Sequence, residues 1–97
     1  MTFEAIEPGT FKFIAKNNNV LSYSIDNGET WVELASNTNT PTISAGSKIM
    51  WKGNCTVKTE DYWNGSIGQF SSTGKFKISG NIFSLINGDN FEGIYKI

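Results

Sequence analysis

The chain contains no histidine and no arginine, and its only cysteine is Cys55. Without histidine, no side chain has an ordinary pKa close to neutrality, so the most common general acid and base of enzymes is missing. Without arginine, the usual bidentate partner of phosphate and carboxylate groups is missing too. A lone cysteine excludes an internal disulfide and a Cys/His metal cluster. We therefore expect no enzyme, no cofactor and no resident metal ion.

Long apolar segments and a strong net charge are also absent. No stretch approaches the roughly 20 apolar residues that span a bilayer, and the first residues, Met1–Ile6, lack the basic segment of a signal peptide. The net charge of −1 creates no field that would attract nucleic acid or an anionic membrane. We expect a soluble protein, made in a reducing cytoplasm and either cytosolic or exported as part of something else, without a nucleic-acid or membrane partner.

Aromatic residues are the most useful core formers that the chain does contain. Seven Phe, three Trp and three Tyr occur among 97 residues, and large aromatic side chains contribute the most buried area per residue. This length fits one domain with one two-layer core. We predict a single domain over residues 1–97.

Apolar and polar residues alternate with a period of two, and no helical period is sustained. Strands are predicted over 2–6, 10–15, 20–25, 30–35, 48–52, 66–71 and 75–79. Weaker candidates are 42–44 and 82–86, the latter as a strand or one helical turn. Residues 66–71 and 75–79 are predicted to form a hairpin across 72–74, whereas 53–65 looks irregular. The pattern predicts an all-β fold, an antiparallel immunoglobulin-like β-sandwich of about eight or nine short strands.

The most specific local motif is an Asp box, Ser-x-Asp-x-Gly-x-Thr-Trp. Its residues are Ser24, Asp26, Gly28, Thr30 and Trp31. The Asp26 carboxylate can accept backbone N–H groups within a turn, and Gly28 tolerates positive φ. Asp boxes occur in sialidase-like propellers, away from their active sites, but one box cannot make a propeller. We interpret the motif as a structural hairpin, with Trp31 packed over the returning strand.

Two aromatic residues in the irregular stretch are the best candidates for contact with a partner. Tyr62, Trp63 and the adjacent Asn64 can stack on a sugar or anchor a protein. The two aromatic residues can equally fold back over the sheet edge or the core, and both interpretations stay open.

The carboxylates offer two weaker possibilities. Glu60 and Asp61, beside these aromatic residues, form the one cluster that resembles a glycosidase site, but so small a domain rarely encloses a catalytic cleft. Residues 87–90 can supply oxygen ligands to Ca²⁺, yet they lack the full loop with its terminal glutamate. A plain turn is the simpler interpretation of 87–90.

Several short motifs extend over nearly the whole chain, namely Tyr23–Trp31, Leu34–Thr38, Gly46–Gly53, Ile67–Gly74, Phe76–Ile82 and Gly88–Phe91. In combination they resemble a β-sandwich module of surface proteins from gut anaerobes and of virion proteins from the crAss-like tailed phages that infect them. In many members the module precedes leucine-rich-type repeats. This sequence stops at Ile97 without such repeats, so their adhesive function is not implied.

The resemblance implies a non-enzymatic structural protein of a virion. We expect an auxiliary or decoration protein on the capsid surface of a gut phage, bound to other virion proteins, chiefly the major capsid protein. The alternative is a carbohydrate-binding or adhesion module on a cell or phage surface, with glycans as partners of Tyr62, Trp63 and Asn64.

Overall fold

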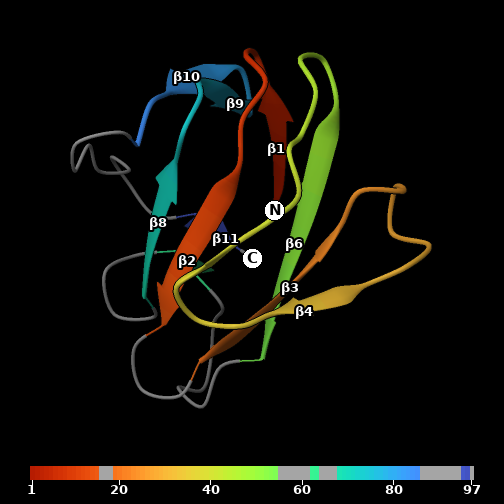
Figure 1. The fold of residues 1–97 in the computed structure, drawn as a ribbon, viewed down its shortest axis with the longest axis vertical. Coiled ribbons are helices and arrows are strands. Elements are labelled where there is room, and N and C mark those ends of the chain that lie inside the picture. The colour runs from red at the N-terminus through yellow and green to blue at the C-terminus, as the bar shows by residue number, and fades with distance from the viewer. Residues whose placement is uncertain (16–18, 55–61, 64–67, 86–94, 97) are drawn as a thin grey trace.

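The structure, a computed structural model, describes residues 1–15, 19–54, 62–63, 68–85 and 95–96. Within these residues it contains strands and no helix, and all strand pairs are antiparallel (Figure 1). The two larger sheets have six and three strands and pack into a sandwich-like fold. The predicted all-β antiparallel sandwich is therefore confirmed, while the immunoglobulin-like strand arrangement stays a prediction.

The larger sheet contains six of the strands. Its order is β10 (Asn81–Phe83), β9 (Phe76–Ile78), β1 (Thr2–Ala5), β6 (Lys48–Asn54), β3 (Val20–Ser24) and β4 (Val32–Leu34). The smaller sheet has the order β5 (Thr38–Asn39), β2 (Phe11–Ala15) and β8 (Gly68–Ser72). A separate two-stranded ladder pairs β11 (Tyr95–Lys96) with β7 (Tyr62–Trp63).

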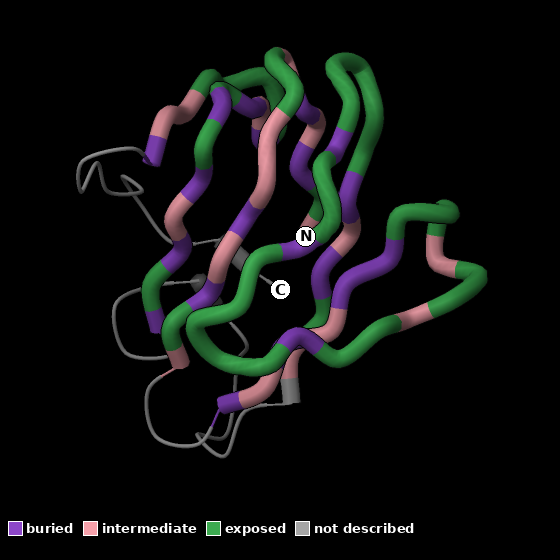
Figure 2. The backbone as a smooth tube through the Cα atoms, in the orientation of Figure 1, coloured by how far each residue is buried: buried purple, intermediate pink, exposed green. Residues whose placement is uncertain are grey.

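Side-chain alternation explains why these segments are strands. On β2, Phe11 and Phe13 are buried while Lys12 and Ile14 face outward, and β8 repeats the alternation from Gly68 to Ser72. Figure 2 shows buried positions alternating with intermediate or exposed ones along these strands. Because successive side chains of a strand point to opposite faces, this sequence pattern directs one face of each sheet into a common core.

An aromatic cluster joins the two sheets. Phe3 is fully buried, and its ring centroid lies 4.6 Å from that of Phe76 in the same sheet. Across the interface the Phe3 ring lies 5.1 Å from Phe70 and 5.4 Å from Phe11. Trp51 completes the cluster at 4.8 Å from Phe70. Tilted and edge-on rings at these separations attract one another in addition to the area that they bury.

The strands β8 and β9 do not form the predicted hairpin. β8 pairs with β2 in the smaller sheet, and β9 pairs with β1 and β10 in the larger one. The link between β1 and β2 runs beside the link between β8 and β9, where Thr10 and Thr73 exchange backbone and side-chain hydrogen bonds. The two chain segments therefore form one long antiparallel ribbon that bends from the larger sheet into the smaller one. The prediction was wrong because Ser72–Gly74 is a corner between sheets.

Three smaller predictions also change. Residues 42–44 contain only an isolated bridge between Ile43 and Gly9, and the short strand lies earlier, at β5. The segment left open between strand and helical turn is a strand, β10. The stretch predicted to be irregular, 53–65, contains the end of β6 and the short β7.

Candidate functional site

The Asp-box residues occupy the tight turn that joins β3 to β4. The Ser24 hydroxyl donates to Asp26 Oδ1 at 2.7 Å and accepts the Gly28 N–H at 2.8 Å. The Thr30 N–H donates to the same Asp26 oxygen at 2.8 Å. Asn27 and Gly28 both have positive φ, 61° and 88°. Two short side chains thus satisfy the backbone donors that such a turn would otherwise leave to solvent.

These hydrogen bonds also determine the charge of the turn. Donation from Thr30, and then from Ser24, lowers the pKa of the Asp26 carboxyl to about 2. Hydrogen bonds to a carboxylate favour its ionised form, and Asp26 is exposed enough to keep its hydration. The turn therefore carries a permanent negative charge at any pH above the acid range.

Trp31 follows the turn and lies on the outer face of the larger sheet. The Lys52 ammonium sits 4.3 Å from the centre of its ring, a cation–π geometry. The indole is only partly buried, and it lies near Gly28 and Met50. The ring thus lies beside the turn and beside Lys52 of the neighbouring strand β6.

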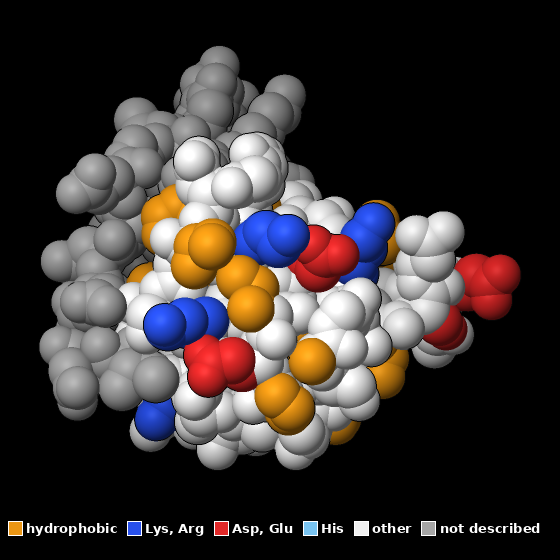
Figure 3. Space-filling view, turned by 90° about the horizontal axis from the view of Figure 1, so that it is seen from above, with side chains coloured by type: hydrophobic (Ala, Val, Ile, Leu, Met, Phe, Trp, Pro, Cys, Tyr) orange, Lys and Arg blue, Asp and Glu red, His pale blue; other side chains and the backbone are white. Residues whose placement is uncertain are grey.

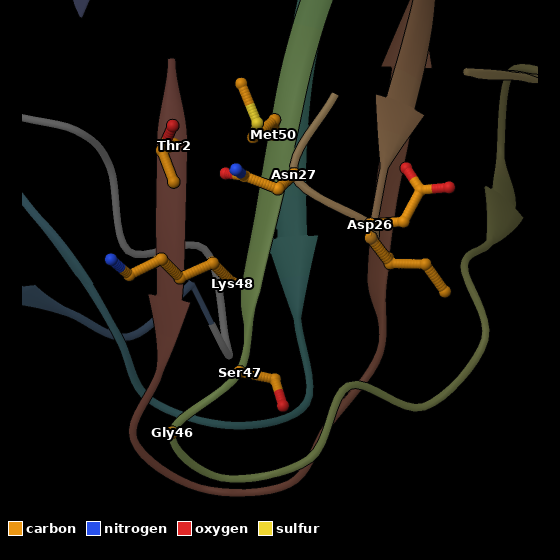
Figure 4. A pocket seen from close by; sticks show the side chains of 8 residues that line it. Thr2, Asp26, Asn27, Gly46, Ser47, Lys48 and Met50 are labelled. Atoms are coloured by element: carbon orange, nitrogen blue, oxygen red, sulfur yellow. The ribbon is translucent and has the colours of Figure 1, made fainter. Parts of the chain in front are cut away.

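An open groove of about 580 Å³ lies between the Asp-box turn and the loop that precedes β6. It is lined by Thr2, Ile25, Asp26, Asn27, Gly46, Ser47, Lys48 and Met50. Figure 4 shows the Asn27 amide between Met50 and Thr2, with Lys48 beside them and the Asp26 carboxylate directed away. The groove therefore offers an amide, hydroxyls and an ammonium group beside an apolar wall.

The sequence did not predict this groove, because its residues come from three segments that are distant along the chain. The pairing register of the strands explains how these three segments come together. Thr2 lies opposite Met50 in the pairing of β1 with β6, and Met50 lies opposite Ser24 in the pairing of β6 with β3. Once the Asp box is known to follow β3, these pairings place its turn beside Thr2. No local motif contains that information.

Charged side chains form a ladder across the outer face of the larger sheet. Lys77, Glu4 and Lys48 are successive cross-strand partners on β9, β1 and β6, and the Lys77 ammonium lies 3.6 Å from Glu4. Ile82, which is 65% exposed, extends the row on β10. Figure 3 shows lysine and carboxylate side chains next to one another at this end of the molecule, with hydrophobic side chains between them. The ladder itself alternates in sign, with Lys77 and Lys48 on either side of Glu4.

The structure places only part of the predicted aromatic contact site. Tyr62 and Trp63 form β7, where Trp63 lies opposite Tyr95 and Tyr62 opposite Lys96. Asn64 lies outside the described residues. β7 pairs with β11 and is not part of either larger sheet, and neither Tyr62 nor Trp63 is among the residues that line the groove.

The remaining candidates from the sequence, Cys55, Glu60, Asp61 and 87–90, also lie outside the described residues. Among the residues that are described, no group of three or more acidic, His or Cys side chains could hold a metal ion. No helix within the described ranges has the length and hydropathy to cross a membrane.

Comparison with known proteins gives no relative: no family model matches the chain, and neither the curated proteins nor the solved structures contain a significant match.

Proposed function

We propose that this chain is a non-enzymatic structural protein of a virion, an auxiliary or decoration protein on the capsid of a gut phage. The motifs quoted above, together with the sandwich-like fold, support this proposal. Its partner is the major capsid protein, and the chain is made in the host cytoplasm and then added to the particle.

The observation that carries the proposal is the outer face of the larger sheet. This face combines a rigid strand platform, the charge ladder of Lys77, Glu4 and Lys48, and apolar side chains at Met50 and Ile82. Protein interfaces likewise combine a few apolar anchors with a polar rim. The groove beside the Asp-box turn is open rather than enclosed, and an open groove suits a protein surface better than a small substrate.

The short edge strands direct binding to this face rather than to the edges. β4 and β10 border the larger sheet, and each has three residues. Short edges limit pairing with a strand of another chain. We therefore infer side-chain contact across the outer face, with the charge ladder setting the orientation of the two partners.

The first test measures the protein in purified virions by quantitative mass spectrometry. We expect a fixed ratio to the major capsid protein, because a decoration protein occupies one kind of lattice site. Absence from particles, or a ratio that varies between preparations, contradicts the proposal.

A second test uses particles stripped of this protein. Ile82→Asp and Lys48→Glu change the outer face and should reduce rebinding by about tenfold or more, the effect expected for an interface anchor. Lys12→Glu is the matched control, because Lys12 lies on the smaller sheet, away from that face. Equal rebinding of all three variants and the wild type contradicts the assignment of the outer face.

Carbohydrate binding is the second candidate function. The specific observation in its favour is the β7–β11 ladder, which places Trp63 directly opposite Tyr95 and next to Tyr62 in sequence. Aromatic residues can stack on sugar rings. A glycan array would test it: binding that Trp63→Ala abolishes and Ile82→Asp leaves intact supports the module, and no signal from the wild type contradicts it.

A further inference from the structure

The Asp-box turn contains an Asn–Gly peptide, Asn27–Gly28, at an exposed position. In such pairs the backbone nitrogen of glycine can attack the side-chain carbonyl carbon of asparagine. A bond forms between that nitrogen and Cγ, the bond from Cγ to the amide nitrogen breaks, and ammonia leaves. Water then opens the succinimide to aspartate or isoaspartate. Glycine favours the attack because it has no Cβ to obstruct it.

In this turn the attacking nitrogen is occupied. The Gly28 N–H donates to Ser24 Oγ at 2.8 Å, and Ser24 is 1% exposed. The Ser24 hydroxyl is itself fixed by donation to Asp26 at 2.7 Å. To attack, the Gly28 nitrogen must lose its proton and turn toward the Asn27 side chain, and both changes break this hydrogen bond.

The backbone of the reacting pair has a defined conformation as well. Asn27 has the left-handed backbone with φ 61°, followed by Gly28 at 88°. Its amide lies over the groove, between Met50 and Thr2 (Figure 4). Of the two reacting groups, the Gly28 nitrogen is the one held by a hydrogen bond, and it stays held while the turn between β3 and β4 is intact.

We propose that Asn27–Gly28 is a latent deamidation site, which the Asp-box hydrogen bonds keep closed in the native state. The reaction proceeds only from molecules in which the turn has opened, and its rate reports the open fraction. The hydrogen exchange of protected backbone amides depends on local opening in the same way.

Deamidation would also weaken the closed turn. Aspartate or isoaspartate at position 27 places a new carboxylate beside Asp26, which is ionised and lies next in the chain. Isoaspartate also adds one carbon to the backbone between Asp26 and Gly28. The spacing that lets Ser24 reach the Gly28 N–H would then be lost.

The experiment incubates the full chain at mildly alkaline pH and follows the one-dalton gain at Asn27 by peptide mapping. The same chain in guanidinium chloride provides the rate for the open state. We expect the native rate to be at least about tenfold lower, since local openings are minor states. Equal rates in the two solvents would overturn the proposal, and this comparison needs no variant.

Two variants then identify the protecting group. Ser24→Ala removes the acceptor of the Gly28 N–H and should raise the native rate severalfold, while remaining folded by circular dichroism. Ser22→Ala is the matched control on the same strand, and it should deamidate at the wild-type rate at Asn27. If both variants react at the same rate, or if Ser24→Ala reacts no faster than the wild type, the assignment to Ser24 is wrong.

Discussion

Ser24 illustrates how one small side chain determines a local structure. Its hydroxyl lies at the end of β3, is buried, and both donates to Asp26 and accepts from Gly28. A buried donor or acceptor that loses its partner costs more than a surface hydrogen bond contributes. The stability of the turn should therefore depend on this hydroxyl more than on any of its exposed neighbours.

Replacing Ser24 with alanine should lower the free energy of unfolding by about 1–2 kcal/mol, because the Gly28 N–H loses its acceptor. Urea denaturation monitored by tryptophan fluorescence measures the change. Ser22→Ala, on the same strand but with only partial burial, should stay within about 0.5 kcal/mol of the wild type. Equal losses for the two variants would mean that the hydroxyl of Ser24 has no special role.

Asp26 should make the stability of the folded chain depend on pH in the acid range. Its pKa is about 2 in the folded chain, against 3.8 as the ordinary value. Because the folded pKa is the lower one, the stabilisation is complete above about pH 4 and is lost as the pH falls towards 2. Asp26→Asn lacks this titration, so its difference in stability from the wild type should shrink over that interval. A difference that stays constant from pH 5 to pH 2 would contradict the hydrogen-bond explanation.

At the level of residues, the sequence predicted the Asp-box turn but not its surroundings. The motif specifies the turn because all its contacts lie within a few residues of one another, from Ser24 to Thr30. Thr2 and Lys48 join the same groove only through strand pairing. The spacing of residues along the sequence does not identify which strands pair, so the groove could not be predicted.

At the level of elements, the bent ribbon is the feature that connects the two sheets. Its corner brings the backbone at Gly9 close to that at Gly74. A Cβ added to Gly9 would lie 2.9 Å from the Gly74 nitrogen and 2.9 Å from the Thr73 hydroxyl oxygen. The corner therefore has room for hydrogen at position 9 and for nothing larger.

Gly9→Ala should accordingly destabilise the chain by about 1–3 kcal/mol, the usual cost of forcing extra volume into a packed site. Thermal unfolding monitored by circular dichroism measures the loss. Ala45→Gly, in the exposed loop before β6, is a comparison that alters backbone freedom without a steric clash. A Gly9→Ala variant as stable as the wild type would show that the two links do not meet closely at this corner.

The turn between β9 and β10 offers a stabilising change. Ser79 has φ 50° and Gly80 has φ 85°, and the two residues separate the paired positions Ile78 and Asn81. Two-residue hairpins of this kind prefer Asn–Gly, because asparagine tolerates the left-handed region better than serine. Ser79→Asn should raise stability by about 0.5–1 kcal/mol. Ser79→Val should lower the stability, because a branched Cβ disfavours positive φ. If Ser79→Val were more stable than Ser79→Asn, the left-handed conformation assigned to residue 79 would be contradicted.

Strand positions were more predictable than strand partners. Alternation located β1, β2, β3 and β6 because burial of one face is a local property of i and i+2. It misplaced the pairing of β8 and β9, since a short polar link between two strands occurs both in hairpins and in corners between sheets. The hydrogen bonds between Thr10 and Thr73, across 63 residues, decide between the two arrangements.

At the level of the whole molecule, the chain extends 34 × 29 × 23 Å along its principal axes. Its two sheets are joined by an aromatic core centred on Phe3, which contacts rings of both sheets. The outer face of the larger sheet lies on the side of that sheet opposite to this core. The proposed function requires this outer face to contact the capsid.

Cryo-electron microscopy of the virion tests the proposed function most directly. The account predicts density of about the size of this domain at equivalent positions of the capsid lattice, with the outer face, including Met50 and Ile82, turned toward the major capsid protein. A capsid map without such density, or one in which that face points to solvent, would contradict the account.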